Sequence, residues 1–244
     1  MRELGLRYPN GKQALAGVDL DVPAGELLVV LGGNGCGKTT LLRCITHGLT
    51  PDTGQVWLDG HALTGLTGER LRQARLDLAM IWQHASLVRR RSVLANVACG
   101  ALGRHRTMWT KFGGLPRSEL PAAHACLAEV GLGHLAGQRA GTLSGGQAQR
   151  VAIARALLQR PLVVLADEPV ASLDPEAANE IMRLLRRLAN EEGLAVLCVL
   201  HQVDLAFAFA DRVVGMRDGR VAFDRTRAQV SADEVQTLYL AEAA

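Results

Sequence analysis

The fold is decided by the stretch Leu31-Gly32-Gly33-Asn34-Gly35-Cys36-Gly37-Lys38-Thr39-Thr40. Gly32 to Thr39 matches the pattern G-x-x-x-x-G-K-[ST], in which glycines let backbone N–H groups point toward phosphate oxygens. The apolar run before it, 27–31, predicts a buried strand, and the helical spacing over 39–47 predicts a helix that stops at Gly48. Because strand, loop and helix occur in this order, we interpret the stretch as a phosphate cradle and not as an accidental glycine-rich turn.

Two side chains of the cradle and two acids further along the chain indicate the chemistry. Lys38 is expected to reach the β- and γ-phosphates of a nucleotide, and the Thr39 hydroxyl is expected to bind Mg²⁺. A predicted buried strand ends in Asp167 and Glu168, and in a parallel sheet such strand ends line the ligand crevice. Because side chains alternate along a strand, one acid can face Mg²⁺ and the other the attacking water.

Length and composition predict one large domain, or one domain with an inserted lobe. The chain has 244 residues, and its net charge of +3 is too small to argue for nucleic-acid binding by itself. The five cysteines are scattered without a C-x-x-C pair, which indicates neither a disulfide framework nor a zinc site and favours a reducing cytosol. The longest apolar runs are too short to span a bilayer, so we expect any membrane attachment to come through a partner.

Apolar patterns along the chain predict alternating strands and helices. Val18, Leu20 and Val22 alternate between two turn signals and predict an antiparallel β element, while the few residues before Tyr8 leave room for a stub of strand. Segment 86–140 shows helical patterns without a clear strand, which predicts an inserted helical lobe. Further predicted elements are strands at 55–58, 78–82, 161–167 and 194–200, helices at 71–77, 93–101, 119–130, 143–159, 175–190, 203–210 and 232–240, and a hairpin at 212–223.

Three polar features stand where predicted elements begin or end. Gln83 follows a predicted strand, at a position usually taken by a polar loop residue. Ser144 is placed as a helix N-cap, and the two glycines after it, Gly145 and Gly146, are unfavourable for helix stability, so close approach of a ligand to the backbone would explain them. His201 follows another strand, and at the carboxyl edge of the sheet we expect it to reach the phosphate site.

A run of positive charge lies between Leu78 and Ser118, where the chain has no Asp or Glu. Such a run is either a solvated face or a surface that meets something acidic, such as lipid head groups or an acidic partner segment. Apolar bulk inside the run suits a contact surface better than a bare solvated face. The cations are Arg89, Arg90, Arg91, Arg104, Arg106, Lys111 and Arg117, and the apolar residues are Met108, Trp109 and Phe112.

The order of these motifs resembles the ATP-binding subunit of ATP-binding-cassette transporters along essentially the whole chain. The counterparts are Walker A at 32–39, the Q-loop at Gln83, the signature at 143–147, Walker B at 163–167 with the acid Glu168, the D-loop at 172–174 and the H-loop at His201. The resemblance implies an α/β fold, in which a P-loop NTPase core with a mostly parallel sheet carries an antiparallel β subdomain and an inserted α-helical subdomain. It also implies one nucleotide-binding domain over 1–244, with a RecA-like core at 1–85 and 141–244 and the helical subdomain at 86–140.

The resemblance further implies ATP and Mg²⁺ as cofactors and assigns roles to the residues. Glu168 is expected to polarise the attacking water and His201 to contact the γ-phosphate. The expected catalytic residues are Lys38, Gln83, Glu168 and His201, and the expected Mg²⁺ ligands are Thr39, Gln83 and Asp167. The expected nucleotide-binding residues are Tyr8, which stacks on adenine, Gly32, Gly33, Asn34, Gly35, Cys36, Gly37, Lys38, Thr39, Thr40, Gln83, Ser144, Gly145, Gly146, Gln147, Asp174 and His201.

Within this family the chain is most similar to phosphonate importer ATPases. The stretches that carry this likeness are 10–15, 87–90, 92–97, 100–104, 166–176 and 200–204. Because this subunit touches ATP and the permease but not the solute, the likeness implies the cargo only by analogy. Two departures are the short start before Tyr8 and Trp82-Gln83-His84 in place of the more usual Phe-Gln-Gln, and neither removes a catalytic group.

The resemblance implies an ATPase that drives phosphonate uptake through a membrane permease, as a peripheral subunit on the cytoplasmic face of the cell inner membrane. Family members work as head-to-tail dimers, in which Ser144, Gly145 and Gly146 of one copy close on the nucleotide held by Lys38 of the other. A periplasmic or extracellular solute-binding protein is an indirect partner, and nucleic acid is not an expected partner.

Two alternative functions remain open at this point. One is an importer ATPase for another small solute, such as phosphite or phosphate. The other is a soluble cassette protein that acts on nucleic acid or the ribosome. Such proteins usually carry tandem cassettes or a long inserted coiled coil, and the sequence shows one cassette and no such insert.

Overall fold

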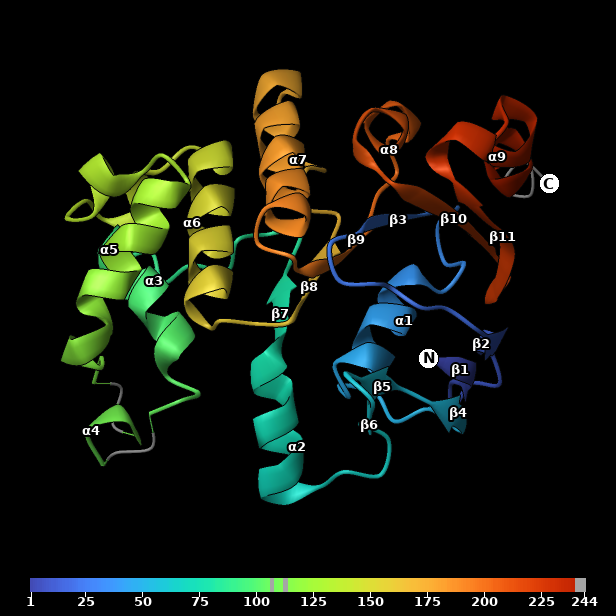
Figure 1. Cartoon of the computed structure of the whole chain (residues 1–244), viewed down its shortest axis with the longest axis horizontal. Helices are drawn as coiled ribbons and strands as arrows, with labels where there is room; N and C mark the ends of the chain where they lie inside the picture. Colours follow the sequence, from blue (N-terminus) through green and yellow to red (C-terminus); the bar gives the residue numbers. More distant parts are fainter. Residues whose placement is uncertain (106–107, 112–113, 240–244) are drawn as a thin grey trace. The chain divides into compact units, whose positions relative to one another are not determined.

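The structure is a computed structural model and describes residues 1–105, 108–111 and 114–239 (Figure 1). The chain folds as two units. The first contains Met1–Arg75 and Leu185–Ala244, and the second contains Leu76–Leu184. The glycine-rich loop therefore belongs to the first unit, and the adjacent pair of acids belongs to the second.

An antiparallel sheet in the first unit has the order β2-β1-β4 and consists of β1 (Arg2–Arg7), β2 (Gln13–Val18) and β4 (Thr53–Gln55). β1 is a six-residue strand, so the prediction of a stub before Tyr8 is wrong. Pairing with β2 on one edge and β4 on the other stabilises this strand at the very start of the chain. The prediction of a strand through Leu20 and Val22 is also wrong, because β2 ends at Val18, and beyond it the Leu20 N–H donates to the Met1 carbonyl.

A small hairpin follows β4. Its strands are β5 (Trp57–Leu58) and β6 (His61–Ala62), so the single strand predicted over 55–58 is divided between β4 and β5. Asp59 and Gly60 form the turn, as predicted, and their φ values are 46° and 76°. Positive φ at both central residues is the requirement of a two-residue hairpin turn that matches the twist of the strands.

The main sheet of the first unit has β3 (Leu27–Leu31) between β9 (Ala195–Val199) and β10 (Arg212–Arg217), and β3 is parallel to both. β11 (Arg220–Thr226) pairs antiparallel with β10, which confirms the predicted hairpin. Every residue of β3 and β9 is buried, as their uninterrupted apolar runs predict. The helices of this unit in the described residues are α1 (Lys38–Ile45), α2 (Gly68–Ala74), α8 (Val203–Phe209), the single turn η6 (Arg227–Gln229) and α9 (Ala232–Tyr239). The predicted end of the last helix, Leu240, lies outside the described residues.

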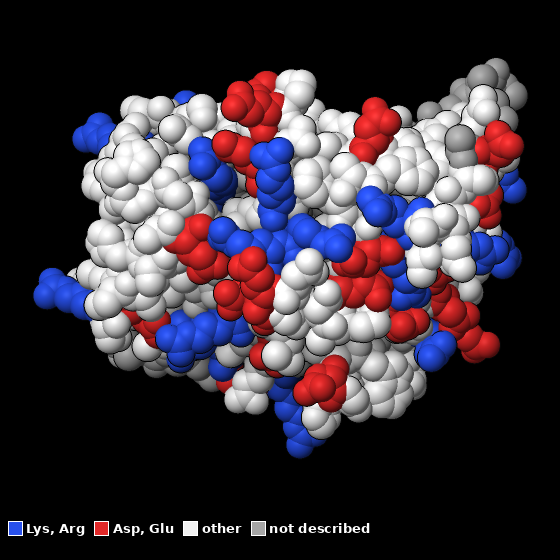
Figure 2. Space-filling model, turned by 45° about the horizontal axis from the view of Figure 1, so that its top comes forward, with Lys and Arg blue, Asp and Glu red and all other residues white. Residues whose placement is uncertain are grey.

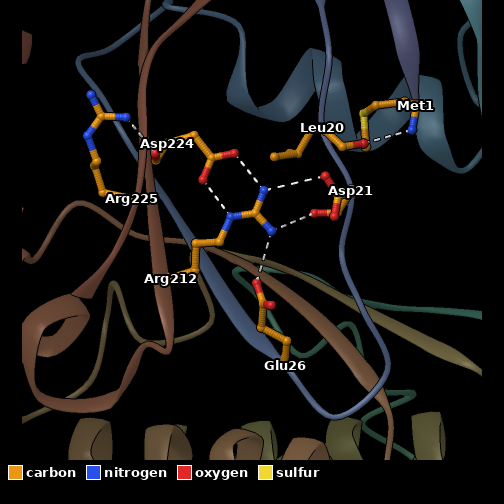
Figure 3. A network of polar contacts seen from close by, with 7 residues as sticks. All are labelled: Met1, Leu20, Asp21, Glu26, Arg212, Asp224 and Arg225. Atoms are coloured by element: carbon orange, nitrogen blue, oxygen red, sulfur yellow. Dashed lines mark hydrogen bonds and ion pairs between the residues drawn. The ribbon is translucent and has the colours of Figure 1, made fainter. Parts of the chain in front are cut away.

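A polar network around Arg212 joins the carboxyl-terminal hairpin to the segment that enters β3 (Figure 3). Arg212 Nε and Nη2 donate to the two carboxylate oxygens of Asp224 at 2.5 and 2.6 Å, and Nη1 donates to Glu26 Oε1 at 3.2 Å. The hydrogen bond with Asp224 raises the pKa of Arg212. Burial raises the pKa of Glu26, and the nearby Arg212 charge acts against this shift. The network fixes β10 and β11 beside the strand that leads into the glycine-rich loop.

The second unit combines a pair of parallel strands with a group of helices. β7 (Leu78–Ile81) and β8 (Val163–Asp167) are parallel, with Leu78 opposite Val163. α3 (Val93–Ala98), α5 (Leu120–Glu129) and α6 (Gly145–Leu158) pack against one another (Figure 1). Val97, Leu127 and Ile153 contribute fully buried side chains, one from each of these helices. The helical patterns predicted over 93–101 and 119–130 are therefore confirmed.

Other elements complete the second unit. α7 (Pro175–Asn190) begins here and has the predicted bounds. The remaining short segments are η1 (Arg75–Asp77), η2 (Cys99–Ala101), α4 (Met108–Lys111), η3 (Arg117–Glu119), η4 (Gly133–Leu135) and η5 (Ala140–Thr142). Arg106 and Phe112 of the predicted basic run lie outside the described residues.

Candidate functional site

The glycine-rich loop connects β3 to α1, and its glycines stand where the backbone requires them. Gly32, Gly35 and Gly37 have φ values of 155°, 72° and 114°, which L side chains rarely adopt. A methyl group on Gly37 would lie 2.5 Å from the Ala14 carbonyl oxygen, and one on Gly32 would collide with the Met216 carbonyl oxygen. Carbonyl groups of β2 and β10 therefore exclude side chains from these two positions of the loop.

Lys38 holds its positive charge inside the loop. Its side chain is 6% exposed, and Nζ donates to the carbonyl oxygens of Gly32 at 2.7 Å and Gly33 at 2.9 Å. The Cys36 sulfur lies 3.8 Å from Nζ. Burial of an ammonium is costly, and neutral carbonyls offset its desolvation only in part. An anion bound at this loop would supply the missing negative charge.

The start of α1 adds donors to the same place. Gly37 is the N-cap residue in a left-handed conformation, and among the described residues no side chain caps the helix and no acid stands in its first turn. The first N–H groups of a helix have no acceptor within the helix, and together with the helix dipole they attract anions. The loop, Lys38 and the helix start thus form an arrangement suited to a phosphate group.

Tyr8, the predicted adenine-stacking residue, is tied to this helix. Its phenol oxygen lies 3.0 Å from the Thr40 hydroxyl oxygen, and either oxygen can donate the hydrogen bond. Tyr8 is half-buried and Thr40 is buried. The bond fixes the aromatic ring relative to the first turn of α1, which a stacking platform for a base requires.

His201 lies at the same edge of the main sheet as the glycine-rich loop. It follows β9, and β9 is parallel to β3, so the carboxyl ends of both strands point the same way. The Leu200 N–H donates to the Val30 carbonyl at 3.1 Å, which extends this pairing toward the loop. His201 itself is half-buried. Of the predicted set, the first unit therefore places Tyr8 beside α1 and His201 at the sheet edge from which the loop leaves.

The second unit carries the predicted acids at the carboxyl end of β8. Asp167 is the last residue of this strand and is 8% exposed, and Glu168 follows it and is half-buried. Gln83 is exposed and follows β7. Because β7 and β8 are parallel with Ile81 opposite Ala166, Gln83 and the two acids lie at one edge of the strand pair.

Glu168 has a left-handed backbone conformation. Its φ is 50°, which costs on the order of 1–3 kcal/mol for a residue with a side chain. Pro169 follows and is buried, and the Glu168 carbonyl accepts a hydrogen bond from the Ala171 N–H at 3.2 Å. Strain of this kind persists where the surroundings fix the backbone, and such positions cluster at functional sites.

Two side chains of α6 hold the segment that carries Gln83, and sequence reasoning missed both. Gln149 is 2% exposed, and its Nε2 donates to the Trp82 carbonyl at 3.0 Å. Arg155 donates to the carbonyls of Ala85 at 2.9 Å and Ser86 at 3.0 Å, and burial lowers the pKa of its guanidinium. The available signal was a polar Gln149 among the apolar positions of a predicted helix, but the backbone partners are far away in the sequence.

The predicted N-cap of α6 is confirmed. Ser144 Oγ accepts a hydrogen bond from the Gln147 N–H at 3.3 Å, and Gln147 Oε1 accepts one from the Ser144 N–H at 3.1 Å. A methyl group on Gly145 would lie 3.1 Å from Leu173 Cδ2, and one on Gly146 would lie 3.0 Å from Ala177 Cβ. The glycines that sequence analysis attributed to a ligand therefore also have close neighbours within their own chain.

Asp174, another predicted nucleotide-binding residue, caps α7. Its Oδ1 accepts a hydrogen bond from the Ala177 N–H at 2.9 Å, and its carbonyl accepts one from the Ala178 N–H at 2.9 Å. Asp174 is exposed. Its carboxylate thus accepts a hydrogen bond from an N–H group at the start of α7 that has no acceptor within the helix. The resemblance assigns Asp174 to nucleotide binding and does not include this capping role.

The basic residues predicted as one run have different environments. Arg89, Arg90 and Arg91 are exposed, whereas Arg104 Nη2 lies 3.1 Å from Glu119 Oε2. Hydrogen bonds from His105 and Arg104 lower the pKa of Glu119. On the face of the molecule in Figure 2, cations and anions are interspersed. Met108 and Trp109 are 65% and 63% exposed, so the run combines a solvated part, a paired part and exposed apolar bulk.

The predicted Mg²⁺ ligands are all oxygen donors, namely the Thr39 hydroxyl, the Gln83 amide and the Asp167 carboxylate. Mg²⁺ prefers oxygen ligands and keeps several waters, so this donor set fits the ion. The described residues contain no cluster of three or more His, Cys, Asp or Glu side chains suited to a metal. In nucleotide complexes of Mg²⁺, water and phosphate oxygens complete the coordination, so one protein carboxylate is sufficient.

Comparison with known proteins finds relatives along nearly the whole chain. The family model described as ABC transporter matches residues 15–171. A phosphonates import ATP-binding protein, PhnC, of Thiobacillus denitrificans is 49% identical over 236 residues, which are 97% of this chain and 90% of the relative. A phosphate-import ATP-binding protein PhnC of Mycolicibacterium smegmatis is 50% identical over 229 residues, which are 93% of this chain and 86% of the relative.

A solved structure shares the fold. The dimeric structure of the ATP-binding cassette MJ0796, in a post-hydrolysis state bound to ADP and Pi, superposes with a TM-score of 0.80 and 31% identity. The likeness covers 93% of this chain and 97% of that chain. The predicted α/β class of a P-loop NTPase, with parallel strands, an antiparallel sheet and a group of helices, is confirmed.

Proposed function

Because the chain belongs to the ABC transporter family, we propose that it is the ATP-hydrolysing subunit of an import system whose cargo is a phosphonate. The observation that carries the ATPase proposal is the buried Lys38 ammonium in a glycine-rich loop at an uncapped helix start. The phosphonate proposal is supported by relatives named for phosphonate import, such as the one from Thiobacillus denitrificans.

Phosphate is the second candidate cargo. It is supported by the relative of Mycolicibacterium smegmatis, which is named for phosphate import and is 50% identical to this chain. Phosphite belongs to the same class of small oxyanions. ATPase stimulation in vesicles that contain the permease distinguishes these cargos, because a binding protein loaded with the true solute is expected to stimulate hydrolysis and one loaded with another oxyanion is not.

For the nucleotide, we propose that Tyr8 stacks on adenine and that the loop binds the phosphates. The expected loop residues are Gly32, Gly33, Asn34, Gly35, Cys36, Gly37, Lys38, Thr39 and Thr40. The positive φ values of the glycines and the uncapped start of α1 support this assignment, since both leave backbone N–H groups available to oxygen atoms.

For hydrolysis, we propose that Glu168 accepts a proton from the attacking water, while Lys38 and His201 bind the γ-phosphate. Gln83 is proposed to orient the water and, with Thr39 and Asp167, to hold Mg²⁺. Bound Mg²⁺ would neutralise charge that develops on the phosphate oxygens. The strained backbone at Glu168 supports a functional role for this residue, because such strain persists where the surroundings fix the backbone and clusters at functional sites.

For assembly, we propose a homodimer in which Ser144, Gly145, Gly146 and Gln147 of one copy, with Asp174, complete the nucleotide site of the other. The dimeric cassette with ADP and Pi supports this, because its likeness to this chain covers 97% of that cassette. We also propose a membrane permease as partner, a solute-binding protein as indirect partner, and a peripheral position on the cytoplasmic face of the inner membrane. No helix in the described part of the chain is long and apolar enough to cross a bilayer.

The ATPase proposal is tested by Glu168→Gln, which keeps the shape of the side chain and removes its basicity. We expect ATP turnover to fall by roughly 10²–10⁴-fold, the range for a positioned acid–base group, while ATP affinity stays near that of the wild type. Glu176→Gln is a matched control, because this acid stands in the first turn of α7 and has no proposed contact with nucleotide. Unchanged turnover in Glu168→Gln would remove this residue from the catalytic role.

A further inference from the structure

The turn between β1 and β2 carries a lysine to which the proposed function gives no role. Three hydrogen bonds fix the backbone of this turn. The Tyr8 N–H donates to the Lys12 carbonyl at 2.9 Å, the Gly11 N–H donates to the Tyr8 carbonyl at 2.9 Å, and the Lys12 N–H donates to Asn10 Oδ1 at 3.1 Å. Because Tyr8 also bonds to Thr40, this turn is anchored to α1.

The Lys12 ammonium lies against the glycine-rich loop. A methyl group on Gly35 would be only 3.3 Å from Lys12 Nζ, so the ammonium occupies the side of the loop from which a side chain at 35 would project. Gly35 has a φ of 72°, which favours glycine, so the Lys12 ammonium meets no side chain of residue 35 there. Lys12 is exposed, and within the described residues it forms no ion pair. Its charge is thus not neutralised by an acid of the described chain.

The two lysines at the loop differ in what they bind. Lys38 is buried, and its ammonium is held by the carbonyls of Gly32 and Gly33. Lys12 enters from a different part of the chain and keeps its three donors available. A polyphosphate carries several charges along its length, and charge-assisted hydrogen bonds to it are stronger than bonds between neutral groups. One buried ammonium neutralises only part of that charge, so a further ammonium beside the loop has phosphate oxygens to contact.

We propose that Lys12 is a second phosphate-binding lysine, whose ammonium contacts the phosphate chain of the nucleotide held by the loop. The inference rests on the proposed nucleotide-binding function and adds to it a specificity for ligands with a polyphosphate chain. Tyr8 and Lys12 then serve one ligand from the two ends of a single turn, the first through the base and the second through the phosphates.

The test compares ATP binding to the wild type, Lys12→Gln and Lys12→Arg by isothermal titration calorimetry. We expect Lys12→Gln to raise the Kd for ATP about threefold to tenfold at low salt, between the effect of an exposed ion pair and that of a charge-assisted hydrogen bond. Lys12→Arg keeps the charge and is expected to retain most of the affinity. Near 1 M salt, where the Debye length is about 3 Å, the difference between Gln and Lys should shrink.

Inorganic tripolyphosphate separates a phosphate contact from an indirect effect through Tyr8. If Lys12 acts on the phosphates, Lys12→Gln weakens tripolyphosphate and ATP by a similar factor. A loss for ATP alone overturns the proposal, because it places the effect at the base.

Covalent labelling gives an independent measurement. The chain has only three lysines, Lys12, Lys38 and Lys111, so acetylation of each is resolved by mass spectrometry. Saturating ATP is expected to slow acetylation of Lys12 several-fold and to leave Lys111 unchanged, and Lys111→Gln serves as a matched loss of charge with normal ATP affinity. Wild-type affinity in Lys12→Gln together with unprotected Lys12 overturns the assignment. A wild-type protein that binds no ATP overturns the proposed function instead.

Discussion

Glycines stand at the starts of both α1 and α6, but within the described residues side chains cap only the start of α6. At α6 the side chains of Ser144 and Gln147 exchange hydrogen bonds with each other's backbone N–H groups. At α1 the N-cap is Gly37, and no side chain of the described residues caps the helix. A closed start is stable without a ligand, whereas an open start keeps donors for an anion.

The glycines of the two helix starts have different physical causes. Gly37 has a φ of 114°, and the Ala14 carbonyl stands where its side chain would be. Gly145 and Gly146 do not have a positive φ, and their nearest neighbours are side chains, those of Leu173 and Ala177. Glycine at α1 is therefore required by the backbone conformation, while glycine at α6 is favoured by the side chains that pack against the helix.

The largest effect is expected for Gly37→Ala. A left-handed conformation costs roughly 1–3 kcal/mol for a residue with a side chain, and overpacking against the Ala14 carbonyl adds roughly 1–3 kcal/mol. The free energy of unfolding should fall by about 2–6 kcal/mol in urea denaturation, and ATP affinity should fall with it because the loop must shift. Gly65→Ala is the matched control, since Gly65 has a φ of 88° and nothing within 4 Å of an added methyl group. Equal losses in the two variants would remove the carbonyl contact from the explanation.

Part of the difference between the two helix starts can be predicted from the sequence, because local sequence patterns determine the strand before α1 and the cap of α6. The uninterrupted apolar runs of β3 and β9 predicted fully buried parallel strands, and the placement of Ser144 before a helical pattern predicted a capped helix start. The pattern of the glycine-rich loop likewise predicted its strand and helix neighbours. In each case the sequence signal lies within a few residues of the motif.

The remainder depends on partners far away in the sequence. β1 is a full strand because β4 pairs with it, although the two are separated by about fifty residues. Gln149 reaches the Trp82 carbonyl, and Lys12 lies against Gly35. No periodicity or spacing encodes such meetings, since register and loop closure are properties of the packed chain. The roles of Gly145 and Gly146 belong to the same class, because Leu173 and Ala177 come from a later helix and its entry loop.

A smaller effect is expected for Ser144→Ala, which opens the start of α6. Loss of a serine N-cap costs about 1 kcal/mol of stability, within a range of roughly 0.5–2 kcal/mol. Ser92→Ala is a matched control, because Ser92 Oγ caps α3 by accepting the Ala95 N–H at 3.1 Å and has no proposed contact with nucleotide. Both variants should lose similar stability in thermal denaturation, and only Ser144→Ala should lower ATP turnover. If turnover fell equally in Ser144→Ala and Ser92→Ala, the loss of activity would follow from the loss of stability alone.

The smallest change in stability is expected for Gly145→Ala. This variant also tests most directly whether the glycines at the start of α6 serve the nucleotide or only their own chain. An alanine in a compatible helical conformation stabilises by roughly 0.4–1 kcal/mol, because the unfolded chain loses freedom. The contact at 3.1 Å is with Leu173 Cδ2, the end of a flexible side chain that can move aside. The free energy of unfolding should therefore rise slightly, while turnover falls if the bare backbone of this residue meets the nucleotide of a second copy. A variant that is more stable and equally active would show that the glycine serves its own chain only, and the closed helix start would then be a structural element without a part in the nucleotide site.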